Sequence, residues 1–251
     1  MLDFGFYNAD CMEHLRDFPD NYFDLAVVDP PYGGGSKDYD ATTQRFGGRF
    51  SRYFDNQPEV KCERMGGRTN RYTIERDGRG WAKKYGYNIC DWDVAPGEDY
   101  FRELFRVSKN QIIWGGNYFE LPPTRCFLIW RKLSISESFT MAMCEYAWTS
   151  FNDNAKMFEC TPQGRPGEGR FHPTQKPVAL YEWILNRYAK PGDIILDTHA
   201  GSGSSLIACR HTGHKYVAFE IDPTYYEKAK KRVDDESAQM TIYDFLQPER
   251  L

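Results

Sequence analysis

The chain has 251 residues, of which 41% are hydrophobic and 27% charged, and its formal net charge is -4. These values are typical of a soluble globular protein and argue against a disordered chain. The net charge gives no overall support for nucleic-acid binding, so any such surface has to be local. We expect one domain over residues 1–251, with an insertion at about 33–90.

The seven cysteines are scattered, and no Cys-x-x-Cys pair exists. This pattern indicates reduced thiols and neither a disulfide framework nor a zinc site, so no metal is predicted. The first residues lack the basic start and apolar core of a signal peptide. No apolar run approaches membrane-spanning length. We therefore expect a cytoplasmic protein without a membrane partner.

Two short strands are predicted at the start of the chain. The candidates are residues 5–9 and 23–28, with a brief helix at 12–18 between them. Strand, helix and strand in quick succession indicate a unit with parallel strands. Asp10 then falls at the same edge of the sheet as the residues that follow the second strand. It has two compatible interpretations, a helix N-cap and a polar contact to a ligand.

The tetrapeptide Asp29-Pro30-Pro31-Tyr32 follows the second strand, where ligands of open α/β sheets bind. Its prolines interrupt the strand ladder and leave carbonyl groups without a competing partner. Asp29 and the Pro30 carbonyl can accept the two hydrogens of an exocyclic amine, and Tyr32 can stack on a base. The alternative is a proline-terminated strand with a surface tyrosine.

The stretch from 45 to 86 is locally basic. It carries eleven Lys and Arg residues against five acids, with aromatic residues interleaved. Basic side chains suit phosphates and aromatic faces suit bases, so this composition favours a nucleic-acid contact. The candidate substrate-binding residues are Arg45, Arg49, Arg68 and Arg71. The alternative is a solvated, mobile insertion.

Regular structure is predicted again from residue 98 onwards. We expect a helix at 98–107, strands at 111–114, 126–130 and 145–148, a helix at 178–188, strands at 193–197 and 216–220 and a helix at 223–233. The tryptophans at three strand ends should pack in the core. Residues 152–171 are polar and contain Gly and Pro, which indicates a flexible loop or a linker.

Two later stretches offer further ligand contacts. Thr174 and Lys176, in the segment 172–177, precede the helix at 178–188, and the positive end of a helix suits a carboxylate. A strand ends at Asp197, and the glycines that follow let the backbone approach a ligand closely. About twenty residues after them, a strand ends at Glu220, which can accept both hydroxyls of a ribose.

The glycine turn differs from a dinucleotide-binding turn. Gly201 and Gly203 lead into an apolar helix, and Ile207 stands where a third glycine would fall. The missing glycine argues against NAD(P) and suits a nucleoside ligand with an amino-acid tail.

Four blocks of this sequence resemble the S-adenosylmethionine-dependent DNA amino-methyltransferases, and more closely the β-group and phage-encoded adenine-N6 enzymes. The blocks are 8–11, 29–32, 172–177 and 197–205 with Glu220. The catalytic tetrapeptide precedes the cofactor glycines, which is the permuted order of that group. The resemblance implies a Rossmann-like class I methyltransferase fold, with a mostly parallel, doubly wound α/β sheet and a circularly permuted motif order.

The resemblance also implies residue roles. The catalytic residues at the flipped base would be Asp29, Pro30, Pro31 and Tyr32. The residues that bind S-adenosylmethionine would be Asp10, Cys11, Thr174, Lys176, Asp197, His199, Gly201, Gly203, Ser204 and Glu220. Asp10 and Cys11 would lie by the adenine of the cofactor, and Glu220 by its ribose. Thr174 and Lys176 would meet its methionine carboxylate.

The implied activity is site-specific methylation of the N6 amine of a flipped adenine in DNA. Cytosine-N4 methylation, methylation of an RNA or protein amine, and an inactive nucleic-acid-binding protein are the alternatives. His199 stands where the family often has phenylalanine, so its role is open. Related enzymes are often dimers, so a homodimer is an open expectation, and the biological role is open among restriction–modification, phage defence and a regulatory mark. The resemblance places the protein in the cytoplasm of a bacterial or phage-infected cell.

Overall fold

A computed structural model of the chain describes residues 2–32, 94–136, 142–165 and 168–246. The chain divides into two compact units, the first made of residues 1–30 with 97–251 and the second of residues 31–96. The strands and helices of the described residues belong to the first unit.

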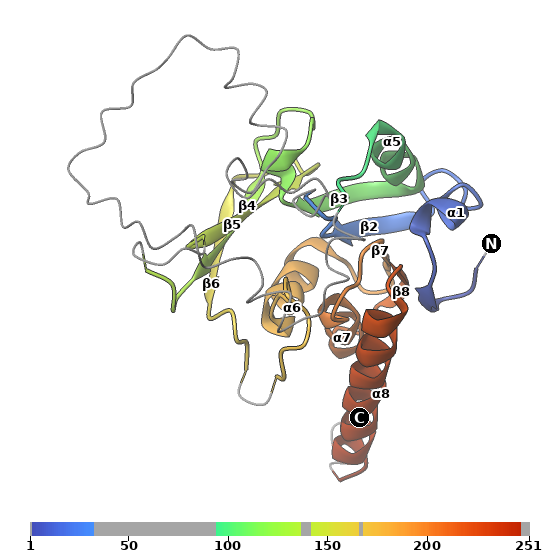
Figure 1. The fold of residues 1–251 in the computed structure, drawn as a ribbon, viewed down its shortest axis with the longest axis vertical. Helices are drawn as coiled ribbons and strands as arrows, with labels where there is room; N and C mark the ends of the chain where they lie inside the picture. The colour runs from blue at the N-terminus through green and yellow to red at the C-terminus, as the bar shows by residue number, and fades with distance from the viewer. Residues whose placement is uncertain (1, 33–93, 137–141, 166–167, 247–251) are drawn as a thin grey trace, which may run out of the picture. The chain divides into compact units, whose positions relative to one another are not determined.

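Eight strands of the first unit form one mixed sheet (Figure 1). They are β1 (Gly5–Asn8), β2 (Phe23–Val28), β3 (Ser108–Trp114), β4 (Phe127–Lys132), β5 (Cys144–Thr149), β6 (Lys156–Cys160), β7 (Ile194–Asp197) and β8 (Lys215–Glu220). Their order across the sheet is β1-β8-β7-β2-β3-β5-β4-β6. Within the described residues, β5 is the strand that runs against its neighbours, and the other pairs are parallel. The predicted mostly parallel sheet is confirmed.

Helices cover both faces of this sheet. They are α1 (Cys11–Leu15), α5 (Glu98–Val107), the short 3-10 helix η2 (Gly116–Tyr118), α6 (Val178–Tyr188), α7 (Ser204–His211) and α8 (Pro223–Leu246). Figure 1 shows α1 and α5 on one side of β2 and β3, with α6 and α7 on the other. The predicted doubly wound arrangement is therefore confirmed. In the described ranges, none of these helices is long and apolar enough to cross a membrane.

Two hydrophobic clusters hold the helices to the sheet. Because successive strand residues point to opposite faces, Leu25 and Val27 of β2 join the cluster with α6 and α7. Ala26 and Val28 join the cluster with α1 and α5. Phe23, the first residue of the strand, also joins this second cluster and does not follow the alternation. Burying one aliphatic side chain of this kind contributes about 1.5–3 kcal/mol. Five of the six strand residues are apolar because both faces are covered, and the exception, Asp24, pairs with Lys109.

The predicted elements recur, with strand bounds shifted by one to three residues, as in β3, which begins at Ser108 and not at residue 111. Three other differences concern two helix ends and one strand. The first helix ends at Leu15 and not at residue 18, because Arg106 of α5 donates to the carbonyl oxygens of Leu15 (3.1 Å) and Phe18 (2.9 Å). The last helix continues to Leu246, and pairs such as Lys230 with Asp234 support its extension. The third difference is an additional strand, β6.

The loop predicted at 152–171 is wrong for residues 156–160, which form β6. This edge strand pairs with β4 alone among the described strands, and Met157 and Glu159 on its outer face are exposed. An edge strand needs little apolar surface, so its sequence pattern is weak. The tryptophans behave as predicted, since Trp114, Trp130 and Trp148 are all buried.

Gly203 provides a test of how tightly the turn before α7 is packed. Gly203 and Gly213 both have φ of 73°. A Cβ at Gly203 would lie 2.9 Å from Cγ2 of Val233, whereas a Cβ at Gly213 would meet nothing within 4 Å. We expect Gly213→Ala to lower the free energy of unfolding by about 1–2 kcal/mol through backbone strain alone. Gly203→Ala should cost about 1–3 kcal/mol more through overpacking.

Urea denaturation of the two variants checks this expectation. Equal losses in free energy would show that the contact with Val233 relaxes without cost.

Candidate functional site

The acidic side chains of the site follow parallel strands at one edge of the sheet. Asp29 follows β2, Asp197 ends β7, Glu220 ends β8, and Asp10 comes two residues after β1. The chain leaves β2 toward β3 and leaves β7 toward β8, so the winding reverses between β7 and β2. Ligands of open α/β sheets bind outside such a reversal. The structure therefore brings these four predicted residues to one candidate binding edge.

Asp197 lies at the centre of this edge and is buried. Burial raises the pKa of its carboxyl to about 7, and the neighbouring carboxylates of Asp29 and Glu220 act in the same direction. The Ser205 hydroxyl and the backbone N–H of His199 (3.0 Å) donate to Asp197 and act in the opposite direction. The edge thus concentrates negative charge, which favours a ligand with hydroxyl groups or positive charge.

Glu220 fastens the glycine turn to β8. Its Oε2 accepts the backbone N–H of Gly201 at 2.8 Å, and its Oε1 accepts the N–H of Asp222 at 2.9 Å. Ser204 is buried at the start of α7, and its hydroxyl lies 3.1 Å from that of Ser202. A carboxylate has about four lone-pair sites, so Glu220 keeps capacity for further donors. The contact of Glu220 with the ribose of a cofactor stays a prediction.

His199 both packs and forms a hydrogen bond. Its Nδ1 lies 2.9 Å from the Thr198 hydroxyl, which in turn lies 2.6 Å from the Tyr100 hydroxyl of α5. The rings of His199 and Tyr100 meet edge to face at a centroid distance of 5.4 Å. Burial lowers the pKa of His199 to about 4. The imidazole is therefore neutral near pH 7 and acts here as an aromatic ring with a polar edge.

The segment before α6 packs against the glycine turn through His172. This buried ring lies edge to face on Tyr225 of α8, with a centroid distance of 4.3 Å. A Cβ at Gly201 would lie 3.4 Å from Cε1 of His172, so the ring also contacts the turn. The Thr174 hydroxyl lies 3.2 Å from Nδ1 of His172, while Thr174 itself is exposed. The 172–177 segment and the glycine turn form one packed group.

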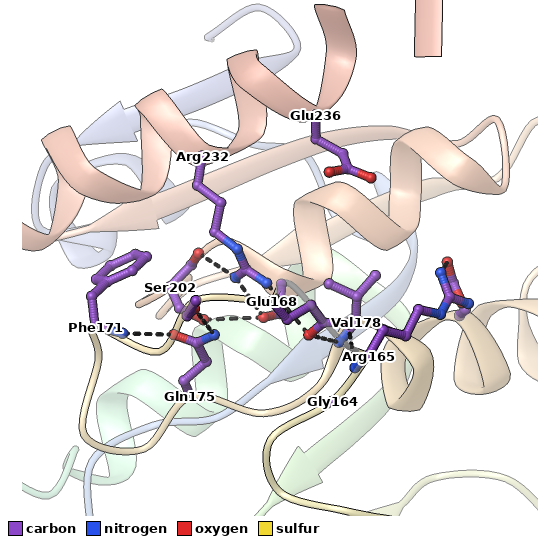
Figure 2. Close-up of polar contacts among 12 residues, drawn as sticks. Gly164, Arg165, Glu168, Phe171, Gln175, Val178, Ser202, Arg232 and Glu236 are labelled. Atoms are coloured by element: carbon purple, nitrogen blue, oxygen red, sulfur yellow. Dashed lines mark hydrogen bonds and ion pairs between the residues drawn. The ribbon is translucent and has the colours of Figure 1, made fainter. Parts of the chain in front are cut away.

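Arg232 of α8 joins the glycine turn to Glu168, which lies in the loop before the 172–177 segment. Figure 2 shows Arg232 reaching toward Ser202 and Glu168. Its Nη1 donates to the Ser202 carbonyl and the Ser204 hydroxyl, both at 2.9 Å, and its Nη2 lies 3.7 Å from Glu168. Glu168 also accepts the backbone N–H of Val178 at the start of α6, at 3.4 Å. Arg232 of α8 thus lies where the glycine turn meets Glu168, and Glu168 in turn contacts the start of α6.

Lys176 connects Asp29 to a row of buried charges. Its Nζ donates to Oδ2 of Asp29 and lies 3.2 Å from Oε2 of Glu145 on β5. Nζ of Lys132 on β4 lies 2.6 Å from Oε1 of Glu145. Burial lowers the pKa of Lys176, but the carboxylates of Asp29 and Glu145 outweigh it, so the pKa lies above its usual value. We call Asp29, Lys176, Glu145 and Lys132 the ion row.

Glu145 and Lys132 were not predicted as site residues. Both lie in strands that carry aromatic side chains, and the signal that could have singled out Glu145 is its charge beside Tyr146. Lys176 was predicted, but for a cofactor carboxylate. Its contact with Asp29 joins residues 147 positions apart, which sequence spacing does not reveal.

Asp10 and Cys11 lie where α1 begins. Asp10 caps the helix by accepting the N–H of Met12 at 2.9 Å, which confirms its predicted structural role. Cys11 is buried, and burial raises its pKa to about 12, so its thiol is protonated at pH 7. Their contacts with the cofactor stay predictions.

The remaining predicted residues belong to the second unit. Pro31 and Tyr32 are described, but they lie in a unit whose position relative to the first is not described. Four candidate substrate-binding residues lie outside the described residues: Arg45, Arg49, Arg68 and Arg71. The first unit thus brings Asp29 and Pro30 to the edge of the sheet and leaves the rest of the tetrapeptide and the basic stretch as predictions.

Comparison with solved structures assigns the fold. The PvuII DNA methyltransferase, which is cytosine-N4-specific, superimposes with a TM-score of 0.53 over 92% of this chain and 90% of its own, at 12% sequence identity. The fold is that of the class I S-adenosylmethionine-dependent methyltransferases. At this identity the likeness concerns the fold alone.

Sequence comparison assigns the family. The family described as DNA methylase, with N6 and N4 members, matches residues 129–231. The DNA adenine methyltransferase YhdJ of Escherichia coli K12 is 40% identical over 261 aligned residues, which cover 90% of this chain and 81% of that protein. The type II methyltransferase M.HpaI of Haemophilus parainfluenzae is 28% identical, with 91% and 73% covered. This chain belongs to the DNA methylase family.

The buried His172 should make the fold sensitive to acid. Burial, followed by the nearby charges of Lys176 and Arg170, lowers its pKa from 6.5 to about 3. The stability that this neutral imidazole contributes is complete above pH 6.5 and is lost as the pH falls below that value. Between pH 7.5 and 5.0 the loss through this one group is about 2 kcal/mol.

Urea denaturation of the wild type and of His172→Gln across this pH range measures the effect. The free-energy difference between the two proteins should shrink toward acid, because the variant lacks the titrating group. A constant difference would contradict the assignment of a depressed pKa to His172.

Proposed function

We propose that this DNA methylase transfers a methyl group from S-adenosylmethionine to the N6 amine of an adenine that is flipped out of DNA. Asp29 carries the choice of base, because an aspartate at the first position of the tetrapeptide favours adenine in the resembling enzymes, whereas a serine there favours cytosine. The relative at 40% identity is named a DNA adenine methyltransferase, which supports the same choice. The tetrapeptide precedes the glycine turn, as in the permuted β-group.

The residues at the edge fit S-adenosylmethionine, the cofactor of this fold class and family. Gly201 and Gly203 have positive φ, and a Cβ at Gly203 would meet Val233, so this tight turn requires glycine, as the cofactor turn of the resembling enzymes does. Glu220 would accept ribose hydroxyls, and Asp10 would lie by the adenine. When bound, the cofactor supplies an electrophilic methyl group on a positively charged sulfur.

Asp29 and Pro30 activate the amine. The lone pair of an exocyclic amine is delocalised into the base, so the nitrogen is a poor nucleophile. Acceptance of its two N–H groups by the Asp29 carboxylate and the Pro30 carbonyl shifts the nitrogen toward tetrahedral geometry and frees the lone pair. Tyr32 stacks on the flipped base. Alignment of amine and methyl group then lowers the barrier by several kcal/mol, as an order of magnitude.

Removal of the Asp29 carboxylate tests this mechanism. Asp29→Ala should lower the methylation rate by about 10²-fold or more, because the amine has one acceptor fewer. Binding of S-adenosylmethionine, measured by calorimetry, should persist. Asp24→Ala is the matched control, since Asp24 lies on the same strand but at its opposite end, where it pairs with Lys109. Retained activity in Asp29→Ala would overturn the assignment.

The modified base identifies the substrate. DNA from cells that express the wild type should contain N6-methyladenine at one short sequence, detected by modification-sensitive sequencing. N4-methylcytosine instead would keep the mechanism and reverse the choice of base. A soluble, cofactor-binding protein that modifies neither base would point to an RNA or protein amine.

We further propose that the basic stretch contacts DNA phosphates. The supporting observation is its excess of Lys and Arg on a chain that is acidic overall. Joint replacement of Arg45, Arg49, Arg68 and Arg71 by alanine should weaken DNA binding and flatten its dependence on log salt by about 0.9 for each phosphate that is no longer neutralised. A control that removes two exposed charges of α8, Lys230→Ala with Lys231→Ala, should leave that slope in place. Equal slopes in all three proteins would refute the proposal.

A further inference from the structure

We propose that Lys176 is a positioning residue for Asp29 in the methyl-transfer step and does not bind the carboxylate of the cofactor. The inference rests on the proposed function, in which Asp29 accepts an N–H of the target amine. It departs from the role that resemblance implies for Lys176. The contacts, the burial and the charge balance of the ion row support it.

The ammonium of Lys176 is enclosed by protein groups. Its side chain is 2% exposed, and Asp29 and Glu145 both accept from it. Its Nζ lies 5.2 Å from the centre of the Trp114 ring, and that tryptophan is itself fully buried. A lysine that binds a free ligand usually keeps its ammonium group accessible to solvent. Here two carboxylates and an aromatic face already surround the charge.

The ion row is electrically balanced as it stands. It contains two carboxylates, Asp29 and Glu145, and two ammonium groups, Lys176 and Lys132. A cofactor carboxylate placed on Lys176 would add a third negative charge to this buried row. Burying an uncompensated charge is costly. The exposed Thr174 can meet such a carboxylate without this cost.

Lys176 has two effects on Asp29. The bond from Nζ to Oδ2 fixes the orientation of the carboxylate. The ammonium also favours the ionised form of a carboxyl group beside it. Within the described part of the chain, further titratable groups near Asp29 include Asp197 at the end of β7, Tyr100 of α5 and Tyr181 of α6. None of these three is a cation, so the positive charge of Lys176 opposes the repulsion between Asp29 and Asp197.

Neutral double substitutions separate this role from a purely structural one. Lys176→Met alone would leave the row with an excess negative charge and would destabilise the fold. Lys176→Met with Glu145→Gln removes one charge of each sign and keeps the row neutral. The matched control is Lys132→Met with Glu145→Gln, which is also neutral but keeps the ammonium on Asp29.

The readouts are the single-turnover rate of DNA methylation as a function of pH and the dissociation constant of S-adenosylmethionine. In the double variant Lys176→Met with Glu145→Gln, we expect the methylation rate to fall by about tenfold or more. The acidic limb of its pH profile should move upward by about 1–3 pH units, because Asp29 loses the charge that keeps it ionised. The dissociation constant should stay within about threefold of the wild type. The control pair should lose less rate and keep its acidic limb in place.

Three other outcomes overturn the inference. Cofactor binding weakened by about tenfold, with the acidic limb unmoved, would assign Lys176 to the cofactor carboxylate. Equal effects in both double variants would reduce the lysine to a structural role. A wild type that binds the cofactor but methylates no DNA would refute the proposed function itself, and that result is read from the wild type alone, before any variant is compared.

Discussion

The parallel pairing of β1, β8, β7 and β2 is the constraint on which the rest of the site depends. It brings the carboxyl ends of four strands to one edge, and with them Asp29, Asp197 and Glu220. Like charges gathered in a buried place repel one another. The chain offsets this repulsion with donors from three directions: backbone N–H groups of the glycine turn, the Ser205 hydroxyl and the ammonium of Lys176.

Local sequence patterns were sufficient for most of the fold. Strands covered on both faces, such as β2, are predominantly apolar, and the helix at Glu98–Val107 has the bounds that its periodicity predicts. The sequence patterns failed where a strand has only one covered side and where a residue far along the chain sets the end of a helix. The edge strand β6 has one covered side, and its alternation of Met157, Phe158 and Glu159 resembles an ordinary loop. The end of α1 is set by Arg106, far along the chain.

The residues of the site likewise divide into those that the sequence predicts and those that it does not. Strand ends could be identified from sequence, so Asp29, Asp197 and Glu220 were each predicted at the end of a strand. Contacts between distant segments could not, because periodicity describes only neighbours along the chain. Lys176 on Asp29, Glu145 on Lys176 and Arg232 on the Ser202 carbonyl are all contacts of this kind. The residues that adjust the site are therefore harder to predict than the residues that define it.

The reversed direction of β5 has a consequence for how such enzymes can diversify. Because β5 runs against its neighbours, its first residues, Cys144 and Glu145, lie at the edge where the parallel strands end. The connection from Lys132 to Cys144 therefore begins and ends at the edge of the sheet where the candidate site lies. Insertions there would change what a family member touches while the sheet stays intact, so this connection is a natural place for evolution to alter the DNA sequence that is modified.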